Sequence, residues 1–168
     1  AVKVLSEGID YVLIHDAVRP LVSAEILERN IEALSLHKAV DTVIPSADTL
    51  VVVKNNTIVE IPDRSLMFRG QTPQSFKLSV LRASYQLWIE DGRPQLTDDC
   101  GVVLKYMPST KIHAIQGDSS NIKITEPIDL HLAEKLFLIR TMEEKPGSMA
   151  GANPNGQIVV VGGKSGIG

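Results

Sequence analysis

Apolar and polar positions along the chain repeat with two different periods. Short, nearly continuous apolar runs are typical of buried strands, and they predict strands at residues 10–14, 39–45 and 111–117. Apolar residues at helical spacing predict helices at residues 23–37, 77–91 and 125–143, with a short helix after residues 97–99. Ser23 and Thr125 can cap two of these helices. Alternating strands and helices favour an α/β layer with a mainly parallel sheet.

The stretch at residues 49–61 interrupts this alternation. Two β-rich runs flank Asn55-Asn56, which predicts a β-hairpin. Two strands alone are marginal in water, so we expect the hairpin to be an arm that packs on another surface, such as a second subunit. The following residues 62–76 contain Pro62 and Pro73, and we expect irregular structure there.

The composition changes after Glu143. Residues 144–156 are rich in Gly, Pro, Asn and Ala and have no apolar period, which predicts a linker. Residues 157–163 then predict the start of a new strand. Since the chain begins with Ala1 and ends in what reads as the start of a domain, we expect a piece of a longer polypeptide.

Composition narrows the class of protein. Hydrophobic residues make up 43% of the chain and charged residues 22%, which is typical of a globular domain. No apolar run approaches the length of a membrane span, and no signal-peptide pattern opens the chain. The net charge of −3 argues against a nucleic-acid groove. The single cysteine, Cys100, excludes an internal disulfide and indicates a cytoplasmic protein, and no Cys/His cluster suggests zinc.

Asp16 and Arg19, in "HDAVRP", follow the first predicted strand. In open parallel sheets, ligands bind beyond the carboxyl ends of the strands. A carboxylate there can hold Mg²⁺, and a guanidinium can bind a phosphate with its planar fork. The alternative is an Asp–Arg pair that only pins a loop.

Three further segments carry candidate polar groups, "RGQTPQSF" (69–76), "TDDC" (97–100) and "GDSSNIKIT" (117–125). The first offers neutral amides and a hydroxyl suited to sugar hydroxyls, although a polar surface turn explains it as well. The second fits helix capping equally well. Lys123, in the third, either meets a phosphate or extends into solvent.

In this order, the motifs "HDAVRP", "ADT", "DR…RGQTPQSF", "TDD" and "SNIKITEPIDL" resemble the cytidylyltransferases that make CDP-polyols, over residues 8–140. That family includes methylerythritol 4-phosphate and ribitol 5-phosphate cytidylyltransferases. The resemblance implies a Rossmann-like nucleotidyltransferase fold over residues 1–143. It also implies that a polyol phosphate attacks the α-phosphate of CTP and releases pyrophosphate, with Mg²⁺ assisting.

The resemblance also implies roles for individual residues. Asp16 would lie near the metal and the polyol, Arg19 would bind phosphate, and Lys123 would neutralise the α-phosphate. Polar contacts to the polyol phosphate would come from Thr49 and Thr72, and Thr97 would occupy a substrate-side position. The hairpin would be the arm of a homodimer, and Arg64 would reach the neighbouring site.

The sequence departs from the family in two ways. The family opens with a strand and a Gly-rich loop whose arginine and lysine wrap the CTP phosphates, and no such segment occurs in these 168 residues. These residues alone would therefore bind CTP poorly. The methylerythritol branch also carries a glutamate in the helix after "TD", whereas "TDDCGVVLKY" has none. This difference favours the ribitol branch.

The final residues, "VGGKSGIG", contain Gly162, Gly166 and Gly168 at the spacing that opens short-chain dehydrogenases/reductases, which residues 157–168 resemble. There the glycines let the backbone approach a dinucleotide, so NADPH is implied for the longer protein. Bifunctional enzymes that reduce ribulose 5-phosphate and then make CDP-ribitol have this order. The alternatives are a glycine-rich turn, a catalytically incomplete dimerisation module, and a simple reductase.

Overall fold

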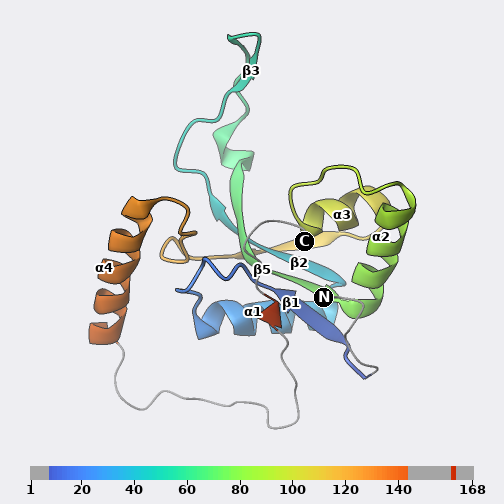
Figure 1. Ribbon diagram of the computed structural model, residues 1–168, viewed down its shortest axis with the longest axis horizontal. Coiled ribbons are helices and arrows are strands. Elements are labelled where there is room, and N and C mark those ends of the chain that lie inside the picture. Colours follow the sequence, from blue (N-terminus) through green and yellow to red (C-terminus); the bar gives the residue numbers. More distant parts are fainter. Residues whose placement is uncertain (1–7, 144–159, 162–168) are drawn as a thin grey trace.

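The computed structural model describes residues 8–143 and 160–161 (Figure 1). Within this part of the chain, five strands form the central sheet in the order β6-β2-β5-β1-β7. These strands are β1 (Tyr11–Ile14), β2 (Ala39–Pro45), β5 (Phe68–Lys77), β6 (Ile112–Gln116) and β7 (Val160–Val161). The strands predicted at residues 10–14, 39–45 and 111–117 are thereby confirmed.

Helices cover both faces of the sheet, because successive strand residues point to opposite sides. α1 (Ala24–Leu36) packs on one face, where the buried residues are Leu13, Leu34, Val40 and Ile115. α2 (Leu78–Glu90) and α3 (Asp99–Tyr106) cover the other. Their cluster contains Val12, Ala39, Phe76, Leu78, Val80, Leu81, Cys100 and Val103. The predicted α/β architecture is confirmed.

The helix ends follow the expected capping chemistry in two cases. The hydroxyl of Ser23 accepts from the Ile26 N–H at 3.3 Å, and the carboxylate of Asp98 accepts from the Gly101 N–H at 2.7 Å. α4 (Pro127–Glu143) confirms the last predicted helix, with a different arrangement at its start. There Asp129 Oδ2 accepts from the Thr125 and Glu126 N–H groups, each at 2.8 Å.

The prediction of irregular structure over residues 62–76 is wrong for residues 68–76, which belong to β5, whereas residues 62–67 form neither a strand nor an α-helix. Residues 74–77 of this strand pair antiparallel with β1, and residues 68–70 and 74–76 pair antiparallel with β2, so the sheet is mixed. Pro73, which joins Thr72 through a cis peptide bond, lies where the β2–β5 register shifts between Asp41 and Val43. Because the ladder is already irregular there, a residue without an N–H is tolerated. A 3₁₀ turn at Arg64–Leu66 precedes the strand.

The predicted hairpin is confirmed as β3 (Val52–Lys54) and β4 (Thr57–Glu60). Asn55 and Asn56 have φ of 49° and 60°, the left-handed conformation that tight hairpin turns require. The arm, residues 49–61, projects away from the sheet (Figure 1). All residues of both arm strands are exposed, including the apolar side chains of Val52, Val53, Ile58 and Val59.

The predicted linker at residues 144–156 lies outside the described residues. Of the predicted strand at 157–163, Val160 and Val161 are described, and they pair in parallel with Leu13 and Ile14 of β1. Throughout residues 8–143, no helix combines the length and the apolar character needed to cross a bilayer.

Candidate active site

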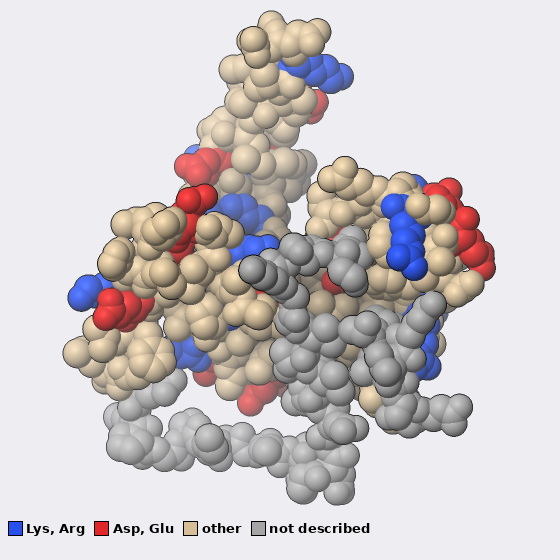
Figure 2. Space-filling view, in the orientation of Figure 1, with Lys and Arg blue, Asp and Glu red and all other residues tan. Residues whose placement is uncertain are grey.

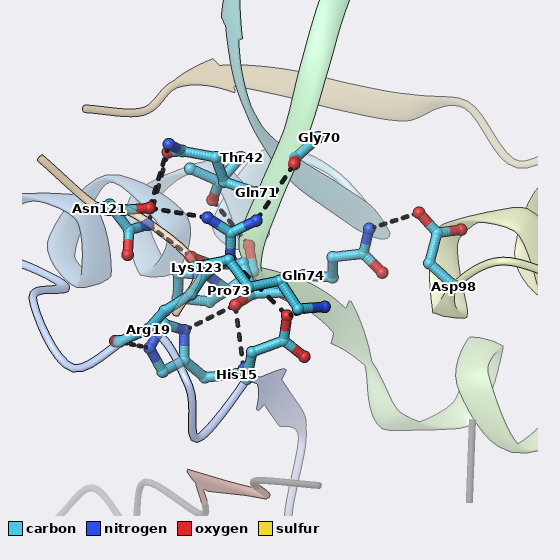
Figure 3. A network of polar contacts seen from close by, with 12 residues as sticks. His15, Arg19, Thr42, Gly70, Gln71, Pro73, Gln74, Asp98, Asn121 and Lys123 are labelled. Carbon is cyan, nitrogen blue, oxygen red and sulfur yellow. Dashed lines mark hydrogen bonds and ion pairs between the residues drawn. The ribbon is translucent and has the colours of Figure 1, made fainter. Parts of the chain in front are cut away.

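Three charged side chains meet beyond the carboxyl end of β1. Lys123 Nζ lies 3.0 Å from Asp16 Oδ2, and Arg19 Nε lies 3.7 Å from the same oxygen. Asp16 and Arg19 belong to the loop after β1, whereas Lys123 belongs to the segment between β6 and α4. Figure 3 shows Arg19 and Lys123 side by side. One carboxylate therefore holds two cations from segments far apart in the sequence.

Thr72 connects this loop to the middle of β5. Its hydroxyl accepts from the Asp16 N–H at 3.0 Å and lies 2.9 Å from His15 Nδ1. The other imidazole nitrogen, Nε2, lies 2.9 Å from the carbonyl of Arg19, which can only accept. We therefore assign the proton to Nε2, so that Nδ1 accepts from the Thr72 hydroxyl. His15, which is buried, thereby fixes the loop that carries Asp16 and Arg19.

The guanidinium of Arg19 is held on several sides. Nη1 donates to the Asn121 carbonyl at 2.7 Å, and Nη2 to the Gly70 carbonyl at 3.5 Å. Burial lowers the pKa of Arg19, while Asp16 opposes that shift. Nε is buried without a hydrogen-bond partner among the described residues. A guanidinium fixed in this way suits an anion, because little freedom is lost when the anion binds.

A pocket of about 330 Å³ adjoins these groups. Its lining includes Arg19, Arg69, Gly70, Gln71, Asn121 and Lys123. Figure 2 shows basic side chains below the base of the arm, between the arm and α4. Three cations around one concavity make it suitable for phosphate groups.

A second polar cluster lies where β2, β5 and α3 meet. Gln74 Nε2 donates to Asp41 Oδ1 at 3.1 Å and to Asp98 Oδ2 at 3.0 Å, so one amide group joins two carboxylates. Gln74 Oε1 accepts from the Cys100 N–H at 3.2 Å. Burial, with a smaller contribution from Asp98, raises the pKa of Asp41 to about 6. Tyr85 donates to Asp99 beside this cluster, which fixes the start of α3.

The structure brings together four of the residues singled out in the sequence: Asp16, Arg19, Thr72 and Lys123. Thr97 is exposed beside the Asp98 cap of α3. Thr49 and Arg64 are exposed on and just after the arm. Within residues 8–143, no hydrogen bond or ion pair joins Thr49 or Arg64 to the charged groups at the sheet edge. The three glycines at 162, 166 and 168 lie outside the described residues.

Three site residues received no role from the sequence. His15 and Asn121 are buried and bonded to the charged loop or its neighbours, and Arg69 lines the pocket. Gln71, whose amide the sequence offered for sugar hydroxyls, is instead buried and bonded to the backbone of Asp118. The sequence marked these residues only by their position next to residues of the recognised motifs. That position does not distinguish a buried amide from a surface amide, because burial depends on how distant segments pack.

The fold of this chain is similar to the folds of solved enzyme structures. The fold is similar to 4-diphosphocytidyl-2C-methyl-D-erythritol synthase from Anaerococcus prevotii, with a TM-score of 0.75 and 31% identity. The match covers 82% of this chain and 63% of that one. It is also similar to 2-C-methyl-D-erythritol 4-phosphate cytidylyltransferase from Thermus thermophilus, with a TM-score of 0.72, 30% identity, and coverage of 82% and 65%. The fold is therefore that of an α/β nucleotidyltransferase.

Residues 1–139 match the family model described as IspD, 2-C-methyl-D-erythritol 4-phosphate cytidylyltransferase. The chain belongs to this family. Curated relatives carry different names within it. The chain is 44% identical over 131 residues to a bifunctional ribulose 5-phosphate reductase/CDP-ribitol pyrophosphorylase from Haemophilus influenzae, covering 77% of this chain and 27% of that protein.

Two other relatives are similarly close. A 2-C-methyl-D-erythritol 4-phosphate cytidylyltransferase from Thermobifida fusca is 42% identical over 76% of this chain and 53% of its own length. A ribitol-5-phosphate cytidylyltransferase from Lactiplantibacillus plantarum is 41% identical over 76% of this chain and 54% of its own length. The chain thus spans between about a quarter and about half of these proteins.

Proposed function

We propose that the full protein transfers a cytidylyl group from CTP to D-ribitol 5-phosphate, giving CDP-ribitol and pyrophosphate. The observation that carries this proposal is the 3.0 Å contact between Lys123 Nζ and Asp16 Oδ2, with Arg19 beside them. Phosphoryl and nucleotidyl transfer depend on positioned charge more than on covalent chemistry by the protein. The site offers such charge at the edge of a sheet, where α/β folds bind ligands.

The reaction has a simple balance. A phosphate oxygen of the polyol phosphate forms a bond to the α-phosphorus of CTP, and the bond from that phosphorus to the β-phosphate oxygen breaks. Arg19 binds the polyol phosphate, and Lys123 neutralises charge on the α-phosphate in the transition state. Asp16 orients Lys123. The Thr72 hydroxyl, whose proton is held by His15 Nδ1, can accept from a hydroxyl group of the polyol phosphate, and Thr97 lies on the substrate side.

The family implies a divalent metal, and Asp16 fits one. Its side chain is 29% exposed, so the carboxylate is accessible to a ligand. In the described part of the chain, no group of three His, Cys, Asp or Glu side chains is placed to hold a metal by itself. Mg²⁺ is commonly bound by one or two carboxylates together with substrate phosphates and waters. Asp16 would therefore hold Mg²⁺ with the nucleotide, and the ion would supply positive charge.

Two features favour ribitol 5-phosphate as the acceptor. α3, with the sequence "DCGVVLKY", has no glutamate where the methylerythritol branch usually carries one. Residues 157–168 resemble the opening of a reductase, and a bifunctional relative is 44% identical. We propose that the full protein also reduces ribulose 5-phosphate, with Gly162, Gly166 and Gly168 at the NADPH site.

We further propose that the protein is a homodimer formed through the arm. The arm exposes a continuous series of apolar side chains, with Val53, Ile58 and Ile61 each more than half exposed at 54%, 56% and 62%. An isolated two-stranded ribbon of this kind needs a surface to pack on. In such a dimer, Thr49 and Arg64 of each subunit would reach the site of the other.

The second candidate acceptor is 2-C-methyl-D-erythritol 4-phosphate, which the 42% identity to the Thermobifida fusca enzyme favours. The test is pyrophosphate release by the protein expressed from the complete gene, with CTP, Mg²⁺ and each polyol phosphate in turn. We expect a higher kcat/KM with D-ribitol 5-phosphate. A preference for the methylerythritol compound would place the protein in the other branch, and release with neither would refute the proposed activity.

A further inference from the structure

Two buried amide side chains lie directly behind the charged groups of the site. Gln71, in β5, is 5% exposed, and Asn121, in the segment between β6 and α4, is fully buried (Figure 3). Neither residue has a part in the proposed chemistry. Burying a primary amide costs free energy unless its hydrogen bonds are satisfied. Both amide nitrogens and the oxygen of Gln71 are hydrogen-bonded within the chain, whereas Oδ1 of Asn121 has no hydrogen-bond partner among the described residues. The bonds that do form show what the two side chains hold.

The two amides attach the segment after β6 to β5. Asn121 Nδ2 donates to the Thr72 carbonyl at 2.8 Å. Gln71 Nε2 donates to the Asp118 carbonyl at 2.8 Å and to the Asn121 carbonyl at 3.3 Å. Gln71 Oε1 accepts from the Asp118 N–H at 3.3 Å. We call these two side chains and their bonds the amide clasp.

The clasp sets the position of a group that the catalytic arginine uses. The Asn121 carbonyl, which accepts from Gln71, also accepts from Arg19 Nη1 at 2.7 Å. Lys123 follows two residues later, and the next residue, Ile124, donates its N–H to the Val18 carbonyl at 2.8 Å. The same segment therefore carries Lys123 and provides the acceptor that orients Arg19.

We propose that Gln71 and Asn121 are positioning residues that fix Arg19 and Lys123 before substrate binds. This inference rests on the proposed cytidylyl transfer. Long cationic side chains lose rotamer freedom when they bind phosphate, and a fixed acceptor removes part of that loss in advance. Without the clasp, Arg19 binds the polyol phosphate less tightly, and Lys123 is less often in place for the transition state.

The primary test is Asn121→Asp in the protein expressed from the complete gene. The change keeps the shape of the side chain but removes the donor to the Thr72 carbonyl and adds a buried charge. We expect KM for D-ribitol 5-phosphate to rise about tenfold and kcat to fall about tenfold. A change of about tenfold in either constant is the size expected when one positioned interaction is lost. Unchanged KM and kcat in a folded variant would overturn the proposal.

Asn30 provides a matched control, because it is also fully buried and lies in the same domain. Its Nδ2 donates to the Ile26 carbonyl and to Thr42, and its Oδ1 accepts from Ser75. Asn30→Asp therefore loses buried hydrogen bonds without touching the segment that carries Lys123. We expect it to lower the unfolding midpoint in urea as Asn121→Asp does, while KM and kcat stay within about twofold of wild type. Equal kinetic losses in both variants would mean that the clasp is only structural.

Gln71→Glu gives a second, independent reading. At neutral pH the introduced carboxylate faces the Asp118 and Asn121 carbonyls, which are acceptors, so the clasp opens. Once protonated, the introduced carboxyl group can again donate to one carbonyl. We therefore expect the kcat/KM of this variant, divided by that of wild type, to rise as the pH falls from about 8 to about 6, the range in which a buried carboxyl group can take up its proton. A ratio independent of pH would contradict the assigned bonds.

Backbone amide hydrogen exchange separates failure of this inference from failure of the proposed function. We expect Asn121→Asp to speed exchange in residues 117–124, and Asn30→Asp to leave that segment unchanged. If wild type transfers cytidylyl to no polyol phosphate while exchange behaves as expected, the proposed function fails and the clasp stands. Unchanged exchange in Asn121→Asp would refute the clasp itself.

Discussion

The amine of Lys123 lies 3.0 Å from the carboxylate of Asp16, although most of the domain sequence separates the two residues. The contact is partly exposed, with Lys123 47% and Asp16 29% accessible. An exposed ion pair contributes little to the free energy of folding. The pair matters because it fixes the positive charge of the Lys123 amine beside the Asp16 carboxylate at the proposed site.

Asp16→Asn tests the central carboxylate. A neutral amide no longer holds Lys123 and Arg19 at one point, so we expect kcat/KM for cytidylyl transfer to fall by at least about 100-fold. The midpoint of urea unfolding should change little, because the pair is partly exposed. Asp91→Asn is the matched control, since Asp91 pairs with Lys105 at 3.2 Å on the surface. Near-normal turnover of the Asp16 variant would contradict its assigned role.

Arg64→Ala tests sharing of the site between subunits. Arg64 is exposed next to the arm, and no hydrogen bond or ion pair joins it to Asp16 in the described chain, so in the proposed dimer it would act on the site of the other subunit. We expect the variant to lose activity, and mixed dimers with an Asp16→Asn subunit to recover part of it. In such a dimer, one site combines an intact Asp16 with an intact Arg64. Mixtures no more active than the separate variants would argue against a shared site.

Ile58→Asp tests the arm as an interface. Ile58 is 56% exposed, so a charge there costs the isolated subunit little, but it would be buried in a dimer. We expect sedimentation equilibrium to show a monomer. Leu36→Asp, at an 84% exposed site on α1, should leave the dimer intact. A dimeric Ile58→Asp protein would place the interface elsewhere.

Asp41→Asn tests the buried carboxylate beside Gln74. The pKa of Asp41 is raised to about 6 in the folded protein, above its unfolded value of 3.8. The folded state therefore binds this proton more tightly than the unfolded state does. As the pH rises from about 4 through 6, the buried carboxyl group ionises and the free energy of unfolding of the wild type falls. We expect the stability of the variant relative to wild type to increase over that window, by about 1–2 kcal/mol after allowance for solvent screening. Urea unfolding at several pH values gives this difference directly, and a constant difference would contradict the shift.

Gly117→Ala tests the close approach of Gln71 to the start of the segment after β6. A methyl group at Gly117 would overlap Gln71 Oε1 and contact Thr42. We expect a loss of about 1–3 kcal/mol in the free energy of unfolding, since overpacking a buried site forces side chains to move. Gly70→Ala is the control, because the nearest atom to its added methyl group lies 3.9 Å away. Equal stability of the two variants would show that Gln71 can move freely.

Local patterns predicted most of the elements, because burial on one face leaves a visible period in the sequence. The strand at residues 39–45 and the helix after Ser23 are of this kind. β5 was missed because Pro73 normally argues against a central strand, and the register shift that accommodates it involves β2, which is distant in sequence. The charged site residues were singled out through motifs, and the structure brings Asp16, Arg19 and Lys123 together. The catalytic and binding roles assigned to all the site residues stay predictions.

The contact between Gly117 and Gln71 has a consequence for how the family diversifies. A β-carbon at residue 117 would overlap Oε1 of Gln71 in its present position, so the glutamine side chain would have to move. The two positions therefore constrain each other across the sheet, and substitutions at them should occur together in related sequences. We expect a β-carbon at residue 117 chiefly where residue 71 is shorter or has turned away from it, and the segment that carries Lys123 would then need another attachment to β5.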